Sequence, residues 1–248
     1  MGKILFNWSG GKDSSLALHE VLKHTAREDI ILFTSVNKSY GRISMHGVRM
    51  QLLHAQAESL GIRLETLLLP EAPNMMQYNQ LMQERLQDLV EEEEIETAVF
   101  GDIFLQDLRE YREQQLAKVG IKGEFPIWKR DTTDLIHSFI DLGFRAALVC
   151  INERFLGENF AGREIDSSFL QDLPDGVDPC GENGEYHSYV YAGPIFQHSI
   201  DFTKGETVRR TYQVQEQSDE EEGDVCSLSD KNYDTGFFYT DLLPVLSS

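Results

Sequence analysis

The sequence predicts an α/β fold, in which a five-stranded parallel sheet with helices on both faces is followed by a smaller α+β domain. Two observations carry this prediction. Up to about residue 130, apolar runs of strand length alternate with helical stretches of roughly 10 to 15 residues, as expected when parallel strands are joined by helical crossovers. Beyond that point, short segments rich in Gly, Pro and Asp separate β-like runs. We therefore place a first domain at 1–130 and a second at 131–248.

Continuous apolar runs mark the strands of the first domain, because strands buried on both faces need no polar alternation. Apolar residues at helical spacing lie between these runs, for example Leu18, Val21 and Leu22. The second domain shows a helix face and three β-like runs. The acidic stretch at 217–224 predicts a solvated loop, and the apolar stretch at 236–244 predicts a segment that docks on the body. The expected strands are 3–8, 29–37, 63–70, 96–104, 123–128, 144–152, 187–196 and 207–215, and the helix face of the second domain is 135–140.

Composition narrows the class of protein. The chain has 248 residues, of which 41% are apolar and 26% charged, and it contains no run of 18 apolar residues that would predict a membrane span. The net charge of −20 argues against a nucleic-acid partner, because such binding depends on cations that neutralise phosphates. Three widely spaced cysteines without a CxxC pair argue against a disulfide framework or a zinc site. We expect a cytoplasmic protein whose first residues form a strand and not a signal peptide.

The stretch Ser9–Ser15, "SGGKDSS", directly follows the first apolar run and precedes a helical stretch. Glycines permit close approach of a ligand to the backbone, and the start of a helix offers free N–H groups and a positive dipole end. Lys12 adds a cation, so the expected ligand of this turn is a phosphate. The stretch is not the common nucleotide loop, since Phe6 and Asp13 stand where that pattern needs Gly and Ser or Thr.

"SGGKDSS" resembles the pyrophosphate loop of the N-type ATP pyrophosphatases, which split ATP between the α and β phosphates. The segments at 101–113, 126–131, 179–186 and 193–196 resemble those of the diphthine–ammonia ligase family, and 45–53 is similar to a bacterial-type branch. The resemblance implies a PP-loop fold of the HUP-like kind. It also implies ATP-dependent amidation of the carboxylate of diphthine, a modified histidine on an elongation factor.

Two positions differ from the family pattern and bear on the identity of the acceptor. Members of that family usually read "GEYET" in the late motif, whereas this chain has His187 and Ser188 after Tyr186. Arg109 matches the family spacing, while Arg112 is offset by one position. The acceptor therefore stays open between diphthine and another carboxylate, small or protein-borne.

The resemblance assigns ATP binding to the first turn and to the end of the fourth strand. Lys12 and Asp13 would both act in catalysis, Lys12 by holding the β and γ phosphates and Asp13 also by binding Mg²⁺. Each of these residues also has a purely structural interpretation. Asp13 could stabilise the first turn of a helix through the helix dipole, and Ser14, Ser15 and Asp102 could be helix caps. The expected ATP-binding residues are Ser9, Gly10, Gly11, Lys12, Asp13, Ser14, Ser15, Gly101 and Asp102.

The acceptor side is expected around the loop "CGENGEY" at 180–186. Glu182 and Glu185 are the candidate catalytic acids, which would deprotonate ammonium or orient the acceptor. The alternatives are a solvated turn for these acids, a surface pair with Glu113 for the arginines, and core packing for Trp128. Cys180 is interpreted as structural, and His46 and His187 stay open as site residues. The expected substrate-binding residues are Arg109, Arg112, Trp128, Asp131, Asn183 and Tyr186.

The predicted activity is that of an AMP-forming carboxylate–ammonia ligase of the EC 6.3.1 type, with ATP and Mg²⁺. The acceptor carboxylate attacks the α phosphorus, pyrophosphate leaves, and ammonia from solution or from a partner then displaces AMP. Two alternatives are a tRNA-modifying adenylating enzyme, which would want a basic surface, and a non-catalytic adenine-nucleotide sensor. A homodimer is left open.

Overall fold

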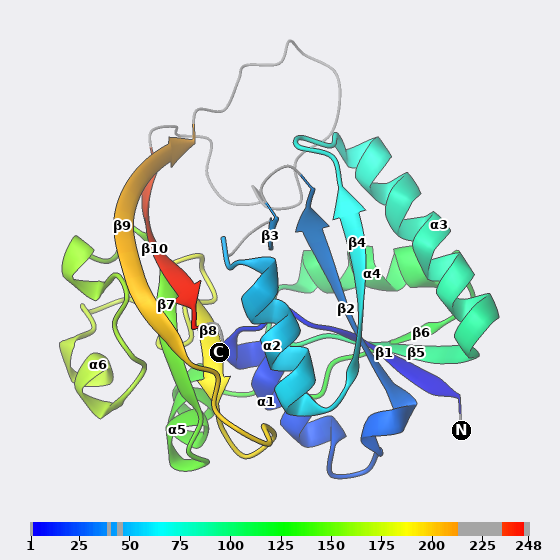
Figure 1. Ribbon diagram of the computed structural model, residues 1–248, viewed down its shortest axis with the longest axis horizontal. Helices are drawn as coiled ribbons and strands as arrows, with labels where there is room; N and C mark the ends of the chain where they lie inside the picture. Colours follow the sequence, from blue (N-terminus) through cyan, green and yellow to red (C-terminus); the bar gives the residue numbers. More distant parts are fainter. Residues whose placement is uncertain (1, 39–40, 44–46, 213–234, 246–248) are drawn as a thin grey trace.

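The computed structural model describes residues 2–38, 41–43, 47–212 and 235–245. It contains a mostly parallel first sheet, flanked by helices, and a separate antiparallel sheet in the C-terminal region (Figure 1). His46 and the predicted acidic loop at 217–224 lie outside the described residues.

The first sheet contains the five predicted parallel strands, which confirms the fold class. Their order in space is β4-β2-β1-β5-β6, and every neighbouring pair in that series is parallel. The short β3 was not predicted and runs antiparallel to the end of β2, opposite Val36 and Asn37. The strands are β1 (Lys3–Asn7), β2 (Ile30–Asn37), β3 (Arg42–Ile43), β4 (Arg63–Leu69), β5 (Ile95–Val99) and β6 (Lys122–Glu124).

The last parallel strand is shorter than predicted. It ends at Glu124, whereas the sequence suggested a strand as far as Trp128. Pro126 has no N–H to offer a sheet ladder, and the backbone N–H of Trp128 donates instead to the carbonyl of Phe125 at 3.1 Å. The segment after β6 is therefore a turn.

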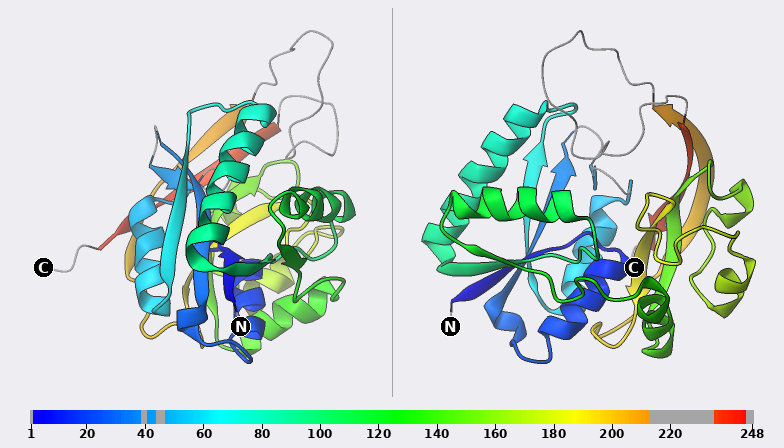
Figure 2. Two further views of the ribbon diagram at one scale, coloured as in Figure 1. Left: turned by 90° about the vertical axis from the view of Figure 1, so that its right-hand side faces the viewer. Right: turned by 180° about the vertical axis from the view of Figure 1, so that it is seen from behind.

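Helices cover both faces of the first sheet. Successive side chains of a strand point to opposite faces, so the apolar side chains of these strands must be buried on both sides. Phe6 of β1 packs in the core with α1 and α2, whereas its neighbour Leu5 packs with α3 and α4. The left view of Figure 2 shows α2 and the α3–α4 pair on opposite sides of the sheet. These helices are α1 (Lys12–Val21), α2 (Met50–Leu60), α3 (Met75–Glu93) and α4 (Gln106–Ala117), with the short 3₁₀ turn η1 at Arg27–Asp29.

The C-terminal region forms a four-stranded antiparallel sheet in the order β8-β7-β10-β9. The apolar segment at 236–244, predicted to dock on the body, forms the inner strand β10. Buried residues of this region join α1 and α2 in one continuous core, so these two helices lie between the sheets (Figure 1). Its elements are α5 (Thr132–Asp141), β7 (Arg145–Asn152), η2 (Glu158–Phe160), α6 (Ser167–Asp172), β8 (Tyr186–Ala192), β9 (Phe202–Tyr212) and β10 (Thr235–Pro244).

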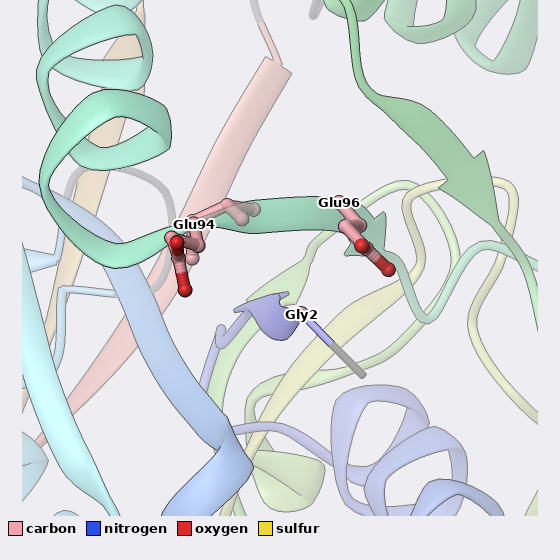
Figure 3. Close-up of a pocket in the computed structure, with 4 residues that line it drawn as sticks. Gly2, Glu94 and Glu96 are labelled. Carbon is pink, nitrogen blue, oxygen red and sulfur yellow. The ribbon is translucent and has the colours of Figure 1, made fainter.

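None of the helices in the described ranges combines the length and the apolar character needed to cross a membrane. A shallow hollow of about 420 Å³ lies where β1 and β5 begin and is lined by Gly2, Glu94, Ile95 and Glu96 (Figure 3). Ligands of open α/β sheets bind at the opposite, carboxyl ends of the strands, so this hollow is not the candidate site.

Candidate functional site

The predicted turn and the predicted Gly101–Asp102 segment meet at one point of the sheet. The turn follows β1 and Gly101 follows β5, and these two strands are neighbours from which the chain winds in opposite directions. Such a switch point is where open α/β sheets bind ligands. A Cβ at Gly101 would lie 2.9 Å from the backbone of Asp13 and of Ser14, so the close approach of the two segments requires glycine.

The C-terminal sheet forms part of the same site. The carbonyl of Gly10 accepts a hydrogen bond from the N–H of Val190 in β8, at 2.9 Å. The N–H of Lys12 donates to Ser188 Oγ at 3.2 Å. Ser188 is not among the predicted site residues, although it lies at the position where the late motif departs from the family pattern. A hydroxyl at that position was the signal that could have found it.

The serines of the turn hydrogen bond locally. Ser14 Oγ and Ser15 Oγ both donate to the carbonyl of Gly11, at 3.0 and 2.9 Å. Ser9 Oγ donates to Ser14 Oγ at 3.0 Å and accepts from the N–H of Gly11 at 3.3 Å. A phosphate contact from these hydroxyls would have to replace the bonds that now shape the first turn of α1.

Lys12 is the buried cation of the site, with 3% of its surface exposed. Its Nζ lies 2.8 Å from Asp13 Oδ2 and 5.2 Å from the centre of the Tyr186 ring. Desolvation opposes the ammonium charge, but the fields of Asp13 and other neighbours outweigh it, so the pKa of Lys12 lies well above its usual value. The lysine is therefore a fixed positive charge.

Two carboxyl groups beside Lys12 have raised pKa values. Desolvation raises the pKa of Asp13, although Lys12 opposes this shift. Asp13 Oδ1 is enclosed and has no hydrogen-bond partner among the described residues. At Glu182, desolvation and then the charge of Asp13 raise the pKa to about 8. Glu182 can therefore exchange a proton near neutral pH.

Glu185 differs from Glu182 because its own loop surrounds it. It is only 1% exposed, and its Oε1 accepts from the N–H of Asp178 at 3.0 Å. Its Oε2 accepts from the N–H of Asn183 at 2.8 Å, and the Asn183 side chain donates to Oε1 at 3.2 Å. Glu185 thus orders the loop, and Asn183 is engaged with it.

The loop at 180–186, which is expected on the acceptor side, lies against the turn at Ser9–Ser15. Tyr186 faces Lys12, and the charges of Asp13 and Glu182 act on each other. Cys180 Sγ donates to the carbonyl of Thr132 at 3.2 Å, and burial raises the pKa of its thiol, in keeping with a structural cysteine.

The predicted arginines Arg109 and Arg112 lie on α4, and Arg112 pairs with Asp102. Arg112 Nε is 2.7 Å from Asp102 Oδ2, and its guanidinium stacks on Phe100. Asp102 therefore carries an ion pair and does not cap α4, whose N-cap residue is Leu105.

The guanidinium of Arg109, on the same helix as Arg112, also stacks on aromatic rings. It lies 4.6 Å from the ring centre of Phe125 and 4.8 Å from that of Trp128. Its Nε donates to Glu113 at 2.8 Å, the surface pair considered as an alternative. Trp128 is half-buried and stacks on this cation, so it is more than a core residue.

Two other predicted residues have positions that the structure explains locally. Asp131 caps α5, where its carboxylate accepts from the N–H of Asp134 at 3.0 Å, and no contact of its carboxylate with the turn is seen in the described part of the chain. His187 lies in β8, paired in register with Cys150 of β7.

Comparisons with known proteins agree with this architecture. Residues 2–123 match the diphthamide synthase N-terminal domain, and residues 131–218 match the diphthamide synthase C-terminal domain. The chain is 28% identical over 131 residues to a diphthine–ammonia ligase of Danio rerio, an alignment that covers 50% of each protein. It is 23% identical over 226 residues to that of Homo sapiens, covering 81% of this chain and 82% of the human one.

A third relative, the diphthine–ammonia ligase of Schizosaccharomyces pombe, is 25% identical over 143 residues, which cover 56% of this chain and 22% of that protein. The chain thus spans about half the length of the zebrafish relative and less of the yeast one. The parallel sheet with a glycine turn at its switch point defines an α/β protein of the PP-loop kind. The chain belongs to the diphthine–ammonia ligase family, whose two diphthamide synthase domains it contains.

Proposed function

We propose that this protein is an ATP-dependent ligase that adenylates a carboxylate and then amidates it with ammonia. The observation that carries the proposal is the buried Lys12–Asp13 pair in the glycine turn at the switch point, with Glu182 beside it. A fixed cation at the start of α1 suits a polyphosphate, because the helix dipole and the lysine both favour negative charge.

The phosphates would be held by Lys12 and by the first N–H groups of α1. Mg²⁺ binds oxygen ligands, and it is usually held by one or two carboxylates together with substrate phosphates. The unpartnered Asp13 Oδ1 fits this requirement, so Asp13 would be the protein ligand. When bound, the ion would neutralise charge on the phosphates, and Lys12 keeps Asp13 oriented towards them.

The acceptor carboxylate would approach from the arginine side. Arg112 is bound to Asp102, which adjoins the turn, while the contacts of the Arg109 guanidinium within the described residues are a half-exposed Glu113 and stacked rings. Exposed pairs of this kind are worth little, so the Arg109 guanidinium can exchange Glu113 for an incoming carboxylate. An oxygen of that carboxylate then attacks the α phosphorus, and pyrophosphate leaves.

Glu182 would handle the proton of the second step. Ammonia is mostly ammonium at neutral pH and must lose a proton before it attacks the acyl adenylate. The pKa of about 8 at Glu182 is close enough to neutrality for a general base, whereas Glu185 already accepts hydrogen bonds with both of its oxygens. The products are an amide and AMP.

Diphthine is the acceptor named for the relatives, and we extend it to this chain only as the first acceptor to test. Purified protein is incubated with ATP, Mg²⁺ and ¹⁵N-ammonium, with and without diphthine-bearing elongation factor or small carboxylates. AMP, pyrophosphate and a ¹⁵N-labelled amide are the expected products. ADP with orthophosphate, or AMP without ¹⁵N in any acceptor, would contradict the proposed ligase.

A further inference from the structure

Gln56 of α2 is a fully buried polar side chain with no assigned role, and it lies where the phosphate turn meets the C-terminal sheet. Its Oε1 accepts a hydrogen bond from the indole Nε1 of Trp8 at 3.0 Å. Its Nε2 donates to the carbonyl of Gly10 at 2.9 Å and to the carbonyl of Val190 at 2.6 Å. One amide thus joins the exit of β1, the turn and strand β8.

The chemistry of these partners fixes the orientation of the amide. An indole N–H can only donate, and a backbone carbonyl can only accept. A flipped Gln56 amide would set N–H against N–H on one side and oxygen against two carbonyls on the other. The arrangement therefore has a single low-energy form, and a buried amide that uses all these bonds specifies geometry beyond packing.

Gly10 is the point at which Gln56 acts on the turn. Gly10 has a φ of +77°, and a Cβ there would lie 2.6 Å from Gln56 Oε1. Its carbonyl accepts from both Gln56 Nε2 and the N–H of Val190, so two donors hold the peptide that leads into Gly11 and Lys12. The direction of that peptide sets where the following N–H groups and Lys12 lie.

We infer that Gln56 is a positioning residue for the phosphate turn, which it shapes through the carbonyl of Gly10 while tying the turn to β8. This inference rests on the proposed ATP site for its effect on catalysis, but its structural part does not depend on that site. The alternative is a purely structural role, in which Gln56 only holds α2 against β8.

Tyr189 supplies a matched control for that alternative. Its hydroxyl donates to the carbonyl of Leu52 at 3.0 Å, so it forms a buried hydrogen bond between the same helix and the same strand without bonding to the turn. Gln56→Met keeps the length of the side chain but removes its hydrogen bonds, and Tyr189→Phe removes one hydroxyl. Each variant loses one hydrogen bond across the α2–β8 junction, and only Gln56→Met also loses the hydrogen bond to Gly10.

The experiment measures amide hydrogen exchange of the peptide covering 9–15, the thermal midpoint and the Kd of MgATP by calorimetry, all on the full-length chain. In Gln56→Met, exchange protection of this peptide and affinity for MgATP should each fall about tenfold or more, because the Gly10 carbonyl keeps only one of its two donors and the buried Trp8 indole N–H loses its acceptor. Tyr189→Phe should leave both unchanged. Equal behaviour of the two variants would overturn the inference.

A second variant keeps the inference testable if Gln56→Met does not fold. Gln56→Glu retains the acceptor for Trp8, and its protonated form can still donate to one of the two carbonyls. Turn protection, corrected for intrinsic exchange, should therefore fall in Gln56→Glu as pH rises from 6 to 8 and stay constant in the unmodified protein. A pH-independent variant would overturn the inference, whereas an unmodified protein that binds no MgATP would contradict only the proposed function.

Discussion

The N–H of Lys12 donates a hydrogen bond to Ser188 Oγ, so a residue of strand β8 caps the start of the helix that carries the proposed phosphate-binding lysine. The two residues lie 176 positions apart in the chain. Because this N–H is one of the free donors at the start of α1, Ser188 decides whether the donor is engaged by protein or left for a ligand.

Ser188→Ala should therefore weaken the ordering of the turn. A buried N–H without its partner costs roughly 1–3 kcal/mol, so we expect the KM for ATP to rise by up to about tenfold. Ser188→Thr keeps the hydroxyl and should behave like the unmodified protein. Steady-state kinetics on both variants checks this, and an alanine variant with an unchanged KM would show that the bond is dispensable.

Lys12→Met should abolish most ATP use. The methionine fills similar space, but it removes the buried cation that Asp13 faces at 2.8 Å. Charged hydrogen bonds are worth roughly 1.5–3 kcal/mol, so kcat/KM for ATP should fall at least about tenfold. Lys118→Met, which removes an exposed positive charge at the C-terminal end of α4, serves as the control for the change in net charge. Retention of full kcat/KM at subsaturating ATP in Lys12→Met would remove the turn from the proposed site.

Glu182→Gln should lower turnover and change the pH dependence of both activity and stability. If deprotonated Glu182 is the base, the rate of the unmodified protein should rise as pH increases through about 8, and the variant should lack this rise. Turnover should fall by roughly 10²–10⁴-fold, the range for a lost general base, while the Kd for ATP stays within about threefold. An unaltered pH profile in the variant would exclude Glu182 as the base.

The stability effect of Glu182 has a definite sign. Its pKa is raised in the folded protein, so between the ordinary value of 4.5 and about 8 the folded state binds more protons than the unfolded state. Stability from this group is therefore present at low pH and is lost as pH rises through about 8. Glu182→Gln should gain thermal stability relative to the unmodified protein at pH 9 but not at pH 4, by calorimetry at both pH values.

Two substitutions at Asp131 can distinguish a helix-capping role of this residue from a substrate-binding role. Asp131→Ala should lower the stability of the protein by about 1 kcal/mol through loss of the α5 cap. Asp131→Asn should restore stability, because asparagine caps equally well without a charge. If the charge binds substrate, Asp131→Asn should still raise the KM for the acceptor, so paired measurements of stability and KM decide between the two roles.

Much of the fold and the heart of the site follow from local signals. Lys12 and Asp13 could be predicted because their glycine turn comes after an apolar strand. Gly101 and Asp102 could be predicted because they lie towards the end of another expected strand, and the carboxyl ends of parallel strands share an edge. The antiparallel β3 could not, because two residues carry no periodicity. The early end of β6 was signalled by Pro126, which the apolar run around it concealed.

The remaining site residues depend on distant partners. Gln56 looks like any polar residue of a helix, and its bonds reach Gly10 and Val190, which lie 46 and 134 positions away. Glu182 and Glu185 look alike in a glycine-rich loop. Only the folded path of that loop turns its own N–H groups towards Glu185 and leaves Glu182 facing the charges of the turn.

The place of β10 in the second sheet has a consequence for synthesis of the protein. This strand lies between β7 and β9, and Asp241 within it also binds Arg42 and Arg49 of the first domain. Among the described strands β10 leaves the ribosome last. Until it does, β9 has no neighbouring strand through which it can join β7 in the sheet. A stop codon shortly after residue 212 should therefore remove an inner strand and not merely a tail, and it should yield a nascent chain that quality-control proteases recognise.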